Sequence, residues 1–244
     1  MIRGGGITIF ICLTETFLKR QTIREKLHLV KPVKIQYSEI NWCGNIFYAA
    51  HVRAYKKSAF KKLKNKCRHP VLTSNSVSVK NFKYSVTANT VLKIFDGKNT
   101  NIALFDKNGS IIHLLPRLVS RCRSVYVYTE RQELYENENN RIFSLIGSAA
   151  VISNSPTLPR GIAAVITDDN LSFGHVKTFG EFGFFADNCA PILDGGKTLS
   201  LPPYADIYTA LTGLYEICKI KNIANAYCDE LSLGSHKFDI KNLP

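Results

Sequence analysis

Short apolar runs and amphipathic segments alternate along the second half of the chain. Apolar runs of this length are typical of strands covered on both faces of a sheet, and apolar residues at helical spacing predict the intervening helices. Strands are predicted at 102–105, 125–129, 149–153 and 162–167, and helices at 109–122 and 131–146. Because strand and helix alternate at this spacing, we expect a parallel sheet with right-handed crossovers.

The pattern in the first hundred residues is less regular. It predicts strands at 7–13, 33–42 and 71–73, and helices at 14–29, 46–66 and 88–95. Beyond the predicted sheet, Asp194-Gly195-Gly196 indicates a hairpin turn, and a closing helix is predicted at 205–220. The predicted fold class is therefore α/β, with a Rossmann-like parallel sheet in the C-terminal part and a smaller basic α/β region before it.

The balance of charged residues also changes near residue 100, where the regular alternation of strands and helices begins. Residues 1–100 hold nineteen Lys and Arg against four acidic residues, whereas residues 101–244 hold thirteen against fifteen. The segment Asp96-Gly97-Lys98-Asn99 reads as a turn or linker at this change of character. We therefore expect a basic α/β region over residues 1–97 and a Rossmann-like domain over residues 98–244.

The strongest concentration of charge lies between residues 53 and 68. Basic residues recur on one side of the predicted helix, including Arg53, Lys57, Lys61 and Lys64, with no acidic residue among them. Such a surface can neutralise the phosphates of nucleic acid, or it can face an acidic partner or anionic lipid. It is equally the pattern of a lysine-rich face that only contacts solvent, because no nucleic-acid-binding motif accompanies it.

Cysteine usage and the apolar runs set the expected compartment. The seven cysteines are odd in number and include no C-x-x-C pair, so we interpret them as reduced thiols in a cytoplasmic protein. The apolar run at 7–13 is too short for a membrane span, which needs about 20 residues, and no other run is longer. Metal ligands are not clustered in the sequence, so no metal site is predicted.

Candidate binding residues follow the predicted parallel strands. In an open α/β sheet, ligands bind beyond the carboxyl ends of the strands, where the strand order reverses. Gly109 permits a tight turn after the first of these strands, and Ser110 would begin a helix whose free N–H groups suit a phosphate. Glu130 follows the second strand, where a carboxylate can accept hydrogen bonds from ribose hydroxyls, and Asn154 follows the third.

In these residues the chain loosely resembles NAD(P)-binding Rossmann domains of the shikimate-dehydrogenase type, over about residues 100–170. The resemblance implies that Glu130 lies near the adenosine ribose and Asn154 beside the dinucleotide. It also implies a nucleotide-binding protein with oxidoreductase-like activity, with NAD(P) as cofactor. The turn after the predicted strand at 102–105 holds one glycine, Gly109, where the G-x-G-x-x-G fingerprint holds three.

Three functions stay open from the sequence. The first is nucleotide binding at the strand ends, with enzymatic activity undecided because no catalytic acid, base or nucleophile can be assigned. The second is a non-enzymatic module that binds nucleic acid or an acidic partner through the basic surface at 53–68. The third is a Rossmann scaffold that has lost its nucleotide and binds only another protein, which the reduced glycine fingerprint favours.

Overall fold

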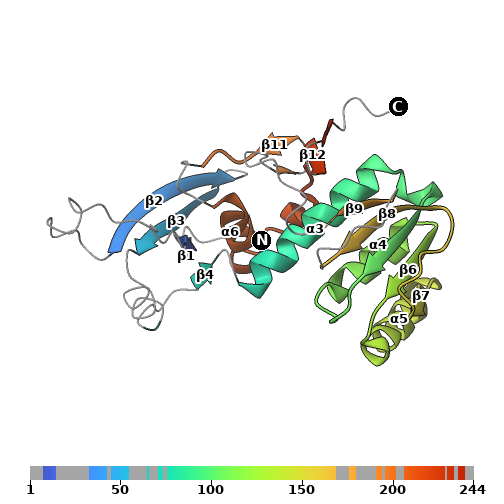
Figure 1. Ribbon diagram of the computed structural model, residues 1–244. Coiled ribbons are helices and arrows are strands. Elements are labelled where there is room, and N and C mark those ends of the chain that lie inside the picture. The colour runs from blue at the N-terminus through green and yellow to red at the C-terminus, as the bar shows by residue number, and fades with distance from the viewer. Residues whose placement is uncertain are drawn as a thin grey trace, which may run out of the picture. The chain divides into compact units, whose positions relative to one another are not determined.

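The chain forms two compact units, which interleave along the sequence (Figure 1). The computed structural model describes residues 8–14, 33–42, 45–54, 65, 71–73, 76–168, 176–179, 191–193, 196–201, 206–228, 230–233 and 236–239. The first unit comprises Met1–Lys80 and Leu199–Ile223, and the second comprises Asn81–Thr198 and Ala224–Pro244. The expected boundary at residue 97 falls within the second unit, and the division into a basic region at 1–97 and a Rossmann-like domain at 98–244 stays a prediction.

The first unit contains a mixed four-stranded sheet in the order β2-β3-β1-β4. Its elements are β1 (Thr8–Thr14), β2 (Val33–Trp42), β3 (Asn45–Ala54), β4 (Val71–Thr73), α6 (Ile207–Thr212) and the π-helical turn Gly213–Ile217. Strand β1 runs parallel to β3 and β4, and β2 runs antiparallel to β3. The strands predicted at 7–13, 33–42 and 71–73 are confirmed, and this unit is α/β as expected.

The helix predicted over 46–66 is wrong for its first nine residues, which lie in β3. The apolar positions there do have helical spacing, but Ile46, Phe47 and Tyr48 also favour strands. Because β3 pairs with β2 on one side and β1 on the other, hydrogen bonding across the sheet overrides the local pattern. Residues 55–64 and 66–70 lie outside the described residues. So does the helix predicted at 14–29, except for Thr14, which lies in β1.

The second unit is built on a parallel five-stranded sheet in the order β7-β6-β5-β8-β9. The strands are β5 (Asn101–Phe105), β6 (Ser124–Tyr128), β7 (Val151–Ser153), β8 (Ile162–Thr167) and β9 (Lys177–Phe179). The chain moves outward from β5 through β6 to β7 and then crosses to β8 on the other side of β5. This is the Rossmann-like arrangement expected from the sequence, and its strand order reverses between β5 and β8.

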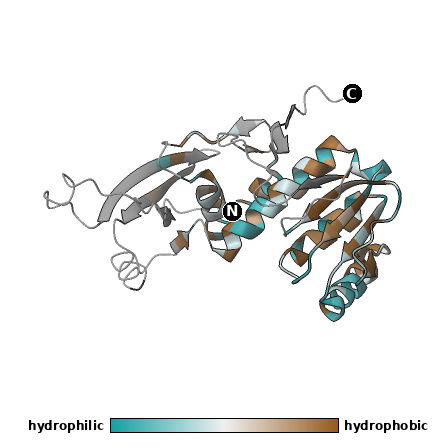
Figure 2. Cartoon of the chain, in the orientation of Figure 1, coloured by the Kyte–Doolittle hydropathy of each residue, from teal (hydrophilic) through white to brown (hydrophobic). Residues whose placement is uncertain are grey.

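Helices cover one face of this sheet and form its main hydrophobic core (Figures 1 and 2). They are α3 (Val77–Ile94), α4 (Leu115–Arg121) and α5 (Gln132–Ile146). Alternate strand residues such as Ile102, Leu104 and Val127 point into this core, whereas Ala103 and Phe105 belong to a smaller cluster on the other face. The crossover from β7 to β8 contains no helix, so this second face is covered by a loop.

Helix α3 is longer than the helix predicted at 88–95, because it begins at Val77. Polar and β-branched residues obscure its first part in the sequence. Their hydroxyl groups are satisfied by carbonyl oxygens one turn earlier: Thr87 Oγ1 donates to Lys83 O at 3.1 Å and Thr90 Oγ1 to Val86 O at 2.7 Å. These local bonds let buried threonines lie inside a helix.

Other elements follow the prediction more closely. The helix predicted at 109–122 begins later, with the 3₁₀ turn η2 (Ile112–Leu114) followed by α4. The hairpin at 194–196 is confirmed by β10 (Ile192–Leu193) and β11 (Lys197–Thr198). Three short elements complete the unit: η1 (Gly97–Asn99), η4 (Lys221–Asn225) and the hairpin of β12 (Glu230–Leu233) and β13 (His236–Asp239); the unit boundary falls within η4.

Candidate functional site at the carboxyl edge of the sheet

The reversal of strand order places the loops after β5 and β8 side by side at the carboxyl edge. Main-chain hydrogen bonds continue the ladder past the strand ends: Asp106 N donates to Tyr128 O at 3.0 Å, and Asp168 N donates to Phe105 O at 3.4 Å. Two aspartates therefore begin the two loops that flank this point. In open α/β sheets this is the usual position for a ligand.

Asp106 is fully buried and is the hub of this edge. Its Oδ1 accepts hydrogen bonds from the Ser110 main-chain N at 2.8 Å, and its Oδ2 accepts from Ile111 N at 2.9 Å and from the Tyr135 hydroxyl at 2.6 Å. The N–H groups that lead into η2 are thereby satisfied by a carboxylate of the chain itself. The Asp106 side chain therefore holds the turn that leads into η2.

Ser110 links the two loops. Its hydroxyl lies 2.5 Å from Asp168 Oδ2 and 3.2 Å from Asp106 Oδ1. A hydroxyl has one hydrogen to donate, and the shorter distance assigns that hydrogen to Asp168. Ser110 therefore holds two carboxylates on opposite sides of the strand-order reversal.

Tyr135 on α5 completes the cluster as a neutral donor. Burial raises the pKa of its phenol far above the ordinary value, and the negative charges of Asp106 and Asp168 raise the pKa further. The hydroxyl therefore keeps its proton and donates it to Asp106. A buried carboxylate with three donors is stable in the interior, whereas an unpaired one would not be.

The predicted residues Gly109, Ser110 and Glu130 are brought together at this edge. Gly109 has φ of 79°, the left-handed conformation that favours glycine, and an added Cβ would lie 2.7 Å from Leu134 Cδ2. Glu130 directly follows Thr129 at the end of β6 and forms an ion pair with Lys107, Oε1 to Nζ 3.2 Å. Both side chains are about half exposed, at 55% and 48%.

Asn154 lies apart from this group, because it follows the edge strand β7 and is exposed. The predicted binding residues did not include the partners that organise the site, Asp106, Tyr135 and Asp168. Asp106 directly follows a buried strand and precedes Ser110 by four residues, a pattern typical of a carboxylate that accepts main-chain hydrogen bonds within its own loop. The pairing with Tyr135 and Asp168 depends on the sheet order and has no local signal.

A small cavity of about 210 Å³ lies beneath the carboxyl ends of β5, β6 and β7 on the second face of the sheet. Aromatic side chains form its floor: Phe105 and Tyr128 stack with ring centroids 4.0 Å apart, and Tyr126 lies beside them. Its roof is the loop from Ser153 to Pro159 that replaces a crossover helix. The cavity is smaller than the roughly 300–1,000 Å³ of a site for a whole ligand and fits a single ring.

Other chemistry is limited in the part of the chain that the structure describes. No group of three or more His, Cys, Asp or Glu side chains gathers there as metal ligands would, and none of its helices is long and apolar enough to cross a membrane. Cys122 and Cys218 are free thiols, and burial raises their pKa values to about 12 and about 11. Neither thiol is an activated nucleophile at neutral pH.

The described residues contain only the beginning of the basic surface predicted at 53–68. The main chain of Arg53 lies in β3, and Lys57, Lys61 and Lys64 lie outside the described residues. Binding of nucleic acid or an acidic partner by these four residues stays a prediction.

The fold and the site together define an α/β protein with a Rossmann-like parallel sheet and a carboxylate cluster at its strand-order reversal. Comparison with known proteins gives no closer relationship, because no family model, no curated protein and no solved structure matches the chain.

Proposed function

We propose that the carboxyl edge of the second unit binds a nucleotide cofactor. The observation that carries the proposal is the position of Glu130, a half-exposed carboxylate at the end of the second strand of a sheet ordered β7-β6-β5-β8-β9. At this position a carboxylate can accept hydrogen bonds from both hydroxyls of a ribose. Its ion pair with Lys107 is exposed and therefore weak, so a ribose can replace Lys107 at low cost.

The hydrogen bonds of Asp106 limit which ligands this edge can bind. In a dinucleotide-binding domain the N–H groups at the first turn bind the pyrophosphate, but here Ser110 N and Ile111 N donate to Asp106. A phosphate at Gly109 and Ser110 has to displace that carboxylate. We therefore favour a ligand whose ribose lies at Glu130 and whose phosphate, where it has one, lies toward Lys107.

The aromatic cavity supports the same proposal, since a base can stack on Tyr126 or Tyr128 from the second face. The proposed class covers NAD(P) and nucleoside cofactors without a pyrophosphate, such as S-adenosylmethionine. An oxidoreductase-like activity belongs to the same proposal when the ligand is NAD(P). The site assigns no residue to hydride transfer or to acid–base chemistry.

A thermal-shift and calorimetric screen with NAD(H), NADP(H), S-adenosylmethionine and ATP tests the proposal. A ligand that binds only the native state should stabilise it by about 2.7 kcal/mol at 100 times its dissociation constant. Glu130→Gln should weaken the binding of that ligand roughly tenfold or more, because a charge-assisted hydrogen bond is lost.

Glu133→Gln is the matched control, since Glu133 is an exposed carboxylate one turn along in α5 that undergoes the same change of charge. It should leave the affinity unchanged. The proposal is overturned if none of these ligands binds the wild-type protein, or if the two variants lose equal affinity.

A further inference from the structure

A second and larger cavity, bordered by described residues of the second unit, lies away from the proposed nucleotide site. Its volume is about 640 Å³, which is within the range of sites that hold a whole small molecule. The cavity lies at the amino edge of the sheet, because its lining includes η1, which leads into the first residue of β5, and the end of α4, which leads into β6. A five-residue strand places this edge roughly 16 Å from the carboxyl edge.

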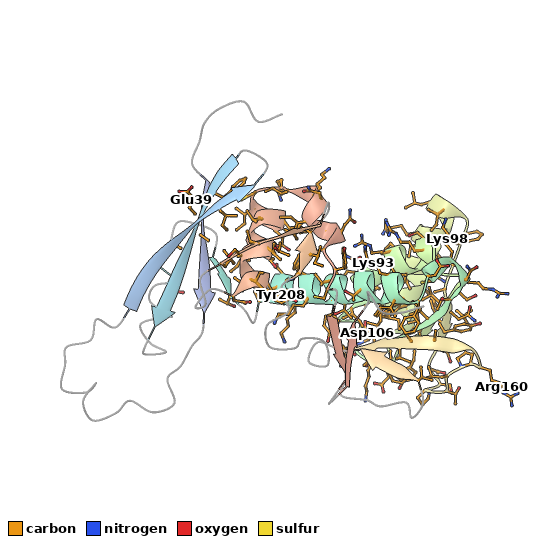
Figure 3. The ribbon with its side chains drawn as sticks, turned by 90° about the horizontal axis from the view of Figure 1, so that it is seen from above. Glu39, Lys93, Lys98, Asp106, Arg160 and Tyr208 are labelled. Carbon is orange, nitrogen blue, oxygen red and sulfur yellow. The ribbon has the colours of Figure 1, made fainter. Side chains whose placement is uncertain are left out.

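The lining is strongly cationic. Among the lining residues that the structure describes, four are basic and one, Asp96, is acidic; the basic residues are Lys93, Lys98, Arg117 and Arg121. Within the described part of the chain, no acidic side chain forms an ion pair with Lys93, Lys98 or Arg121. Figure 3 shows Lys93 and Lys98 near the end of α3.

Asp96 does little to neutralise these cations. Its Oδ2 accepts a hydrogen bond from Asn99 Nδ2 at 3.0 Å, and its main chain is left-handed with φ of 43°. A left-handed conformation is costly for a residue other than glycine, and such strain is often found in binding sites. The carboxylate is thus held at its own turn.

Helix ends explain only part of this charge. Lys93 and Arg121 lie in the last turns of α3 and α4, where a cation complements the helix dipole in any protein. Lys98 lies beyond α3 in η1, and Arg117 lies near the start of α4, where the dipole disfavours a cation. The position of Lys98 therefore needs another reason, whereas Arg117 is held by hydrogen bonds to Ala224 and Asn225.

One wall of the cavity is rigidly built from the segment 224–228. Buried Asn89 donates through Nδ2 to Ala224 O at 2.9 Å and to Ala226 O at 2.8 Å. Arg117 donates to Ala224 O at 2.8 Å and to Asn225 Oδ1 at 2.6 Å.

The next residues of this wall are held in the same way. Tyr227 exchanges two main-chain hydrogen bonds with Ile192 in β10, and Cys228 N donates to Thr90 Oγ1 at 3.0 Å. Lys93 Nζ lies over the Tyr227 ring, 3.5 Å from its centroid. These contacts fix the cavity in shape before any ligand arrives, which lowers the entropic cost of binding.

We propose that this cavity binds a small molecule that carries two or more phosphate groups. Lys93, Lys98 and Arg121, which have no acidic partner among the described residues, offer more charge than one phosphate needs. Guanidinium and ammonium groups are the usual partners of phosphate oxygens in proteins. The cationic groups line one cavity of about 640 Å³ instead of following an extended track, which fits a small molecule better than a nucleic-acid backbone.

The test is a calorimetric titration of the full chain with tripolyphosphate at low and moderate salt. We expect binding that weakens as salt rises, because exposed charges are screened. Lys98→Gln and Arg121→Gln should each weaken binding roughly tenfold, the loss of one charge-assisted hydrogen bond. Both side chains are exposed, so the melting temperatures of the variants should stay close to that of the wild type.

Arg160→Gln is the matched control, because Arg160 is an exposed arginine of the same unit that does not line the cavity (Figure 3). It should bind tripolyphosphate like the wild type, and so should Glu130→Gln. Failure of the proposed nucleotide site therefore leaves this result unchanged.

Two competing ligands test what kind of molecule the cavity binds. ATP that competes with tripolyphosphate would support a nucleotide-sized occupant. The proposal is overturned if tripolyphosphate does not bind, if Arg160→Gln weakens binding as much as Arg121→Gln, or if a single-stranded oligonucleotide displaces tripolyphosphate at a far lower concentration and loses affinity in the same variants.

Discussion

The carboxyl and amino edges of one parallel sheet have opposite electrostatic character. At the carboxyl edge, the carboxylates of Asp106 and Asp168 are held by Ser110, and Asp106 is buried and accepts further hydrogen bonds. At the amino edge, cations such as Lys98 and Arg121 line an open cavity without acidic partners among the described residues. The comparison shows that charge can stabilise one part of a fold and remain available to a ligand in another.

The largest loss of stability should come from Asp106→Asn. The substitution keeps the shape but replaces an acceptor oxygen by an NH₂ group, which must then face Ser110 N, Ile111 N or the Tyr135 hydroxyl. We expect a loss of about 2–4 kcal/mol in the free energy of unfolding, measured in urea.

Asp96→Asn makes the same chemical change at the amino edge. Asp96 is exposed, and asparagine tolerates its left-handed main chain, so we expect a change below about 0.5 kcal/mol. Similar losses in the two variants would remove the distinction between a structural and an available charge.

Glycines sharpen the comparison at the amino edge. Gly97→Ala would place a Cβ 2.7 Å from the Arg121 carbonyl oxygen and 2.8 Å from Leu92 Cδ2, and we expect a loss of about 2 kcal/mol from overpacking. Gly147→Ala meets no atom within 4 Å and should cost about 1 kcal/mol through its left-handed main chain alone. Urea unfolding measures both, and only the first variant should also weaken tripolyphosphate binding.

A further prediction for the carboxyl edge concerns Tyr135. Tyr135→Phe removes one donor from Asp106 and should cost about 1 kcal/mol at neutral pH. The native state keeps the phenolic proton because its pKa is raised, whereas the unfolded chain loses that proton above about pH 10. The unfolded state then binds fewer protons, so wild-type stability must fall as pH rises further.

The pH profile of the variant provides the check. Urea unfolding between pH 8 and pH 11 should show a shallower alkaline loss of stability in Tyr135→Phe than in the wild type. Parallel profiles would mean that Tyr135 ionises in the folded protein as it does in the unfolded chain, and that the buried cluster at the carboxyl edge is open to solvent.

Much of the second unit could be predicted from its sequence, because buried parallel strands are continuous apolar runs. The run at 102–105 needs no information from elsewhere in the chain to be recognised as a strand. Strand β3 and the first part of α3 were not predicted. β3 depends on two neighbouring strands, and the first part of α3 contains polar residues such as Thr87, whose hydroxyl bonds one turn back in the helix.

The candidate site could also be predicted only in part. The residue types after β5 and β6 indicated an edge with polar groups, and the structure brings Gly109, Ser110 and Glu130 to that edge. The contact between Ser110 and Asp168 joins positions 58 residues apart. Such a contact follows from strand order, which a single sequence does not encode in any local pattern.

The interleaving of the two units has a consequence for the order of synthesis on the ribosome. Residues 199–223 complete the first unit, yet they are made after residues 81–198 of the second. The segment 224–228, which forms a wall of the cationic cavity, is made later still. The first unit therefore cannot be complete before most of the second has been synthesised, and the cationic cavity can be closed only after residues 224–228 have been made.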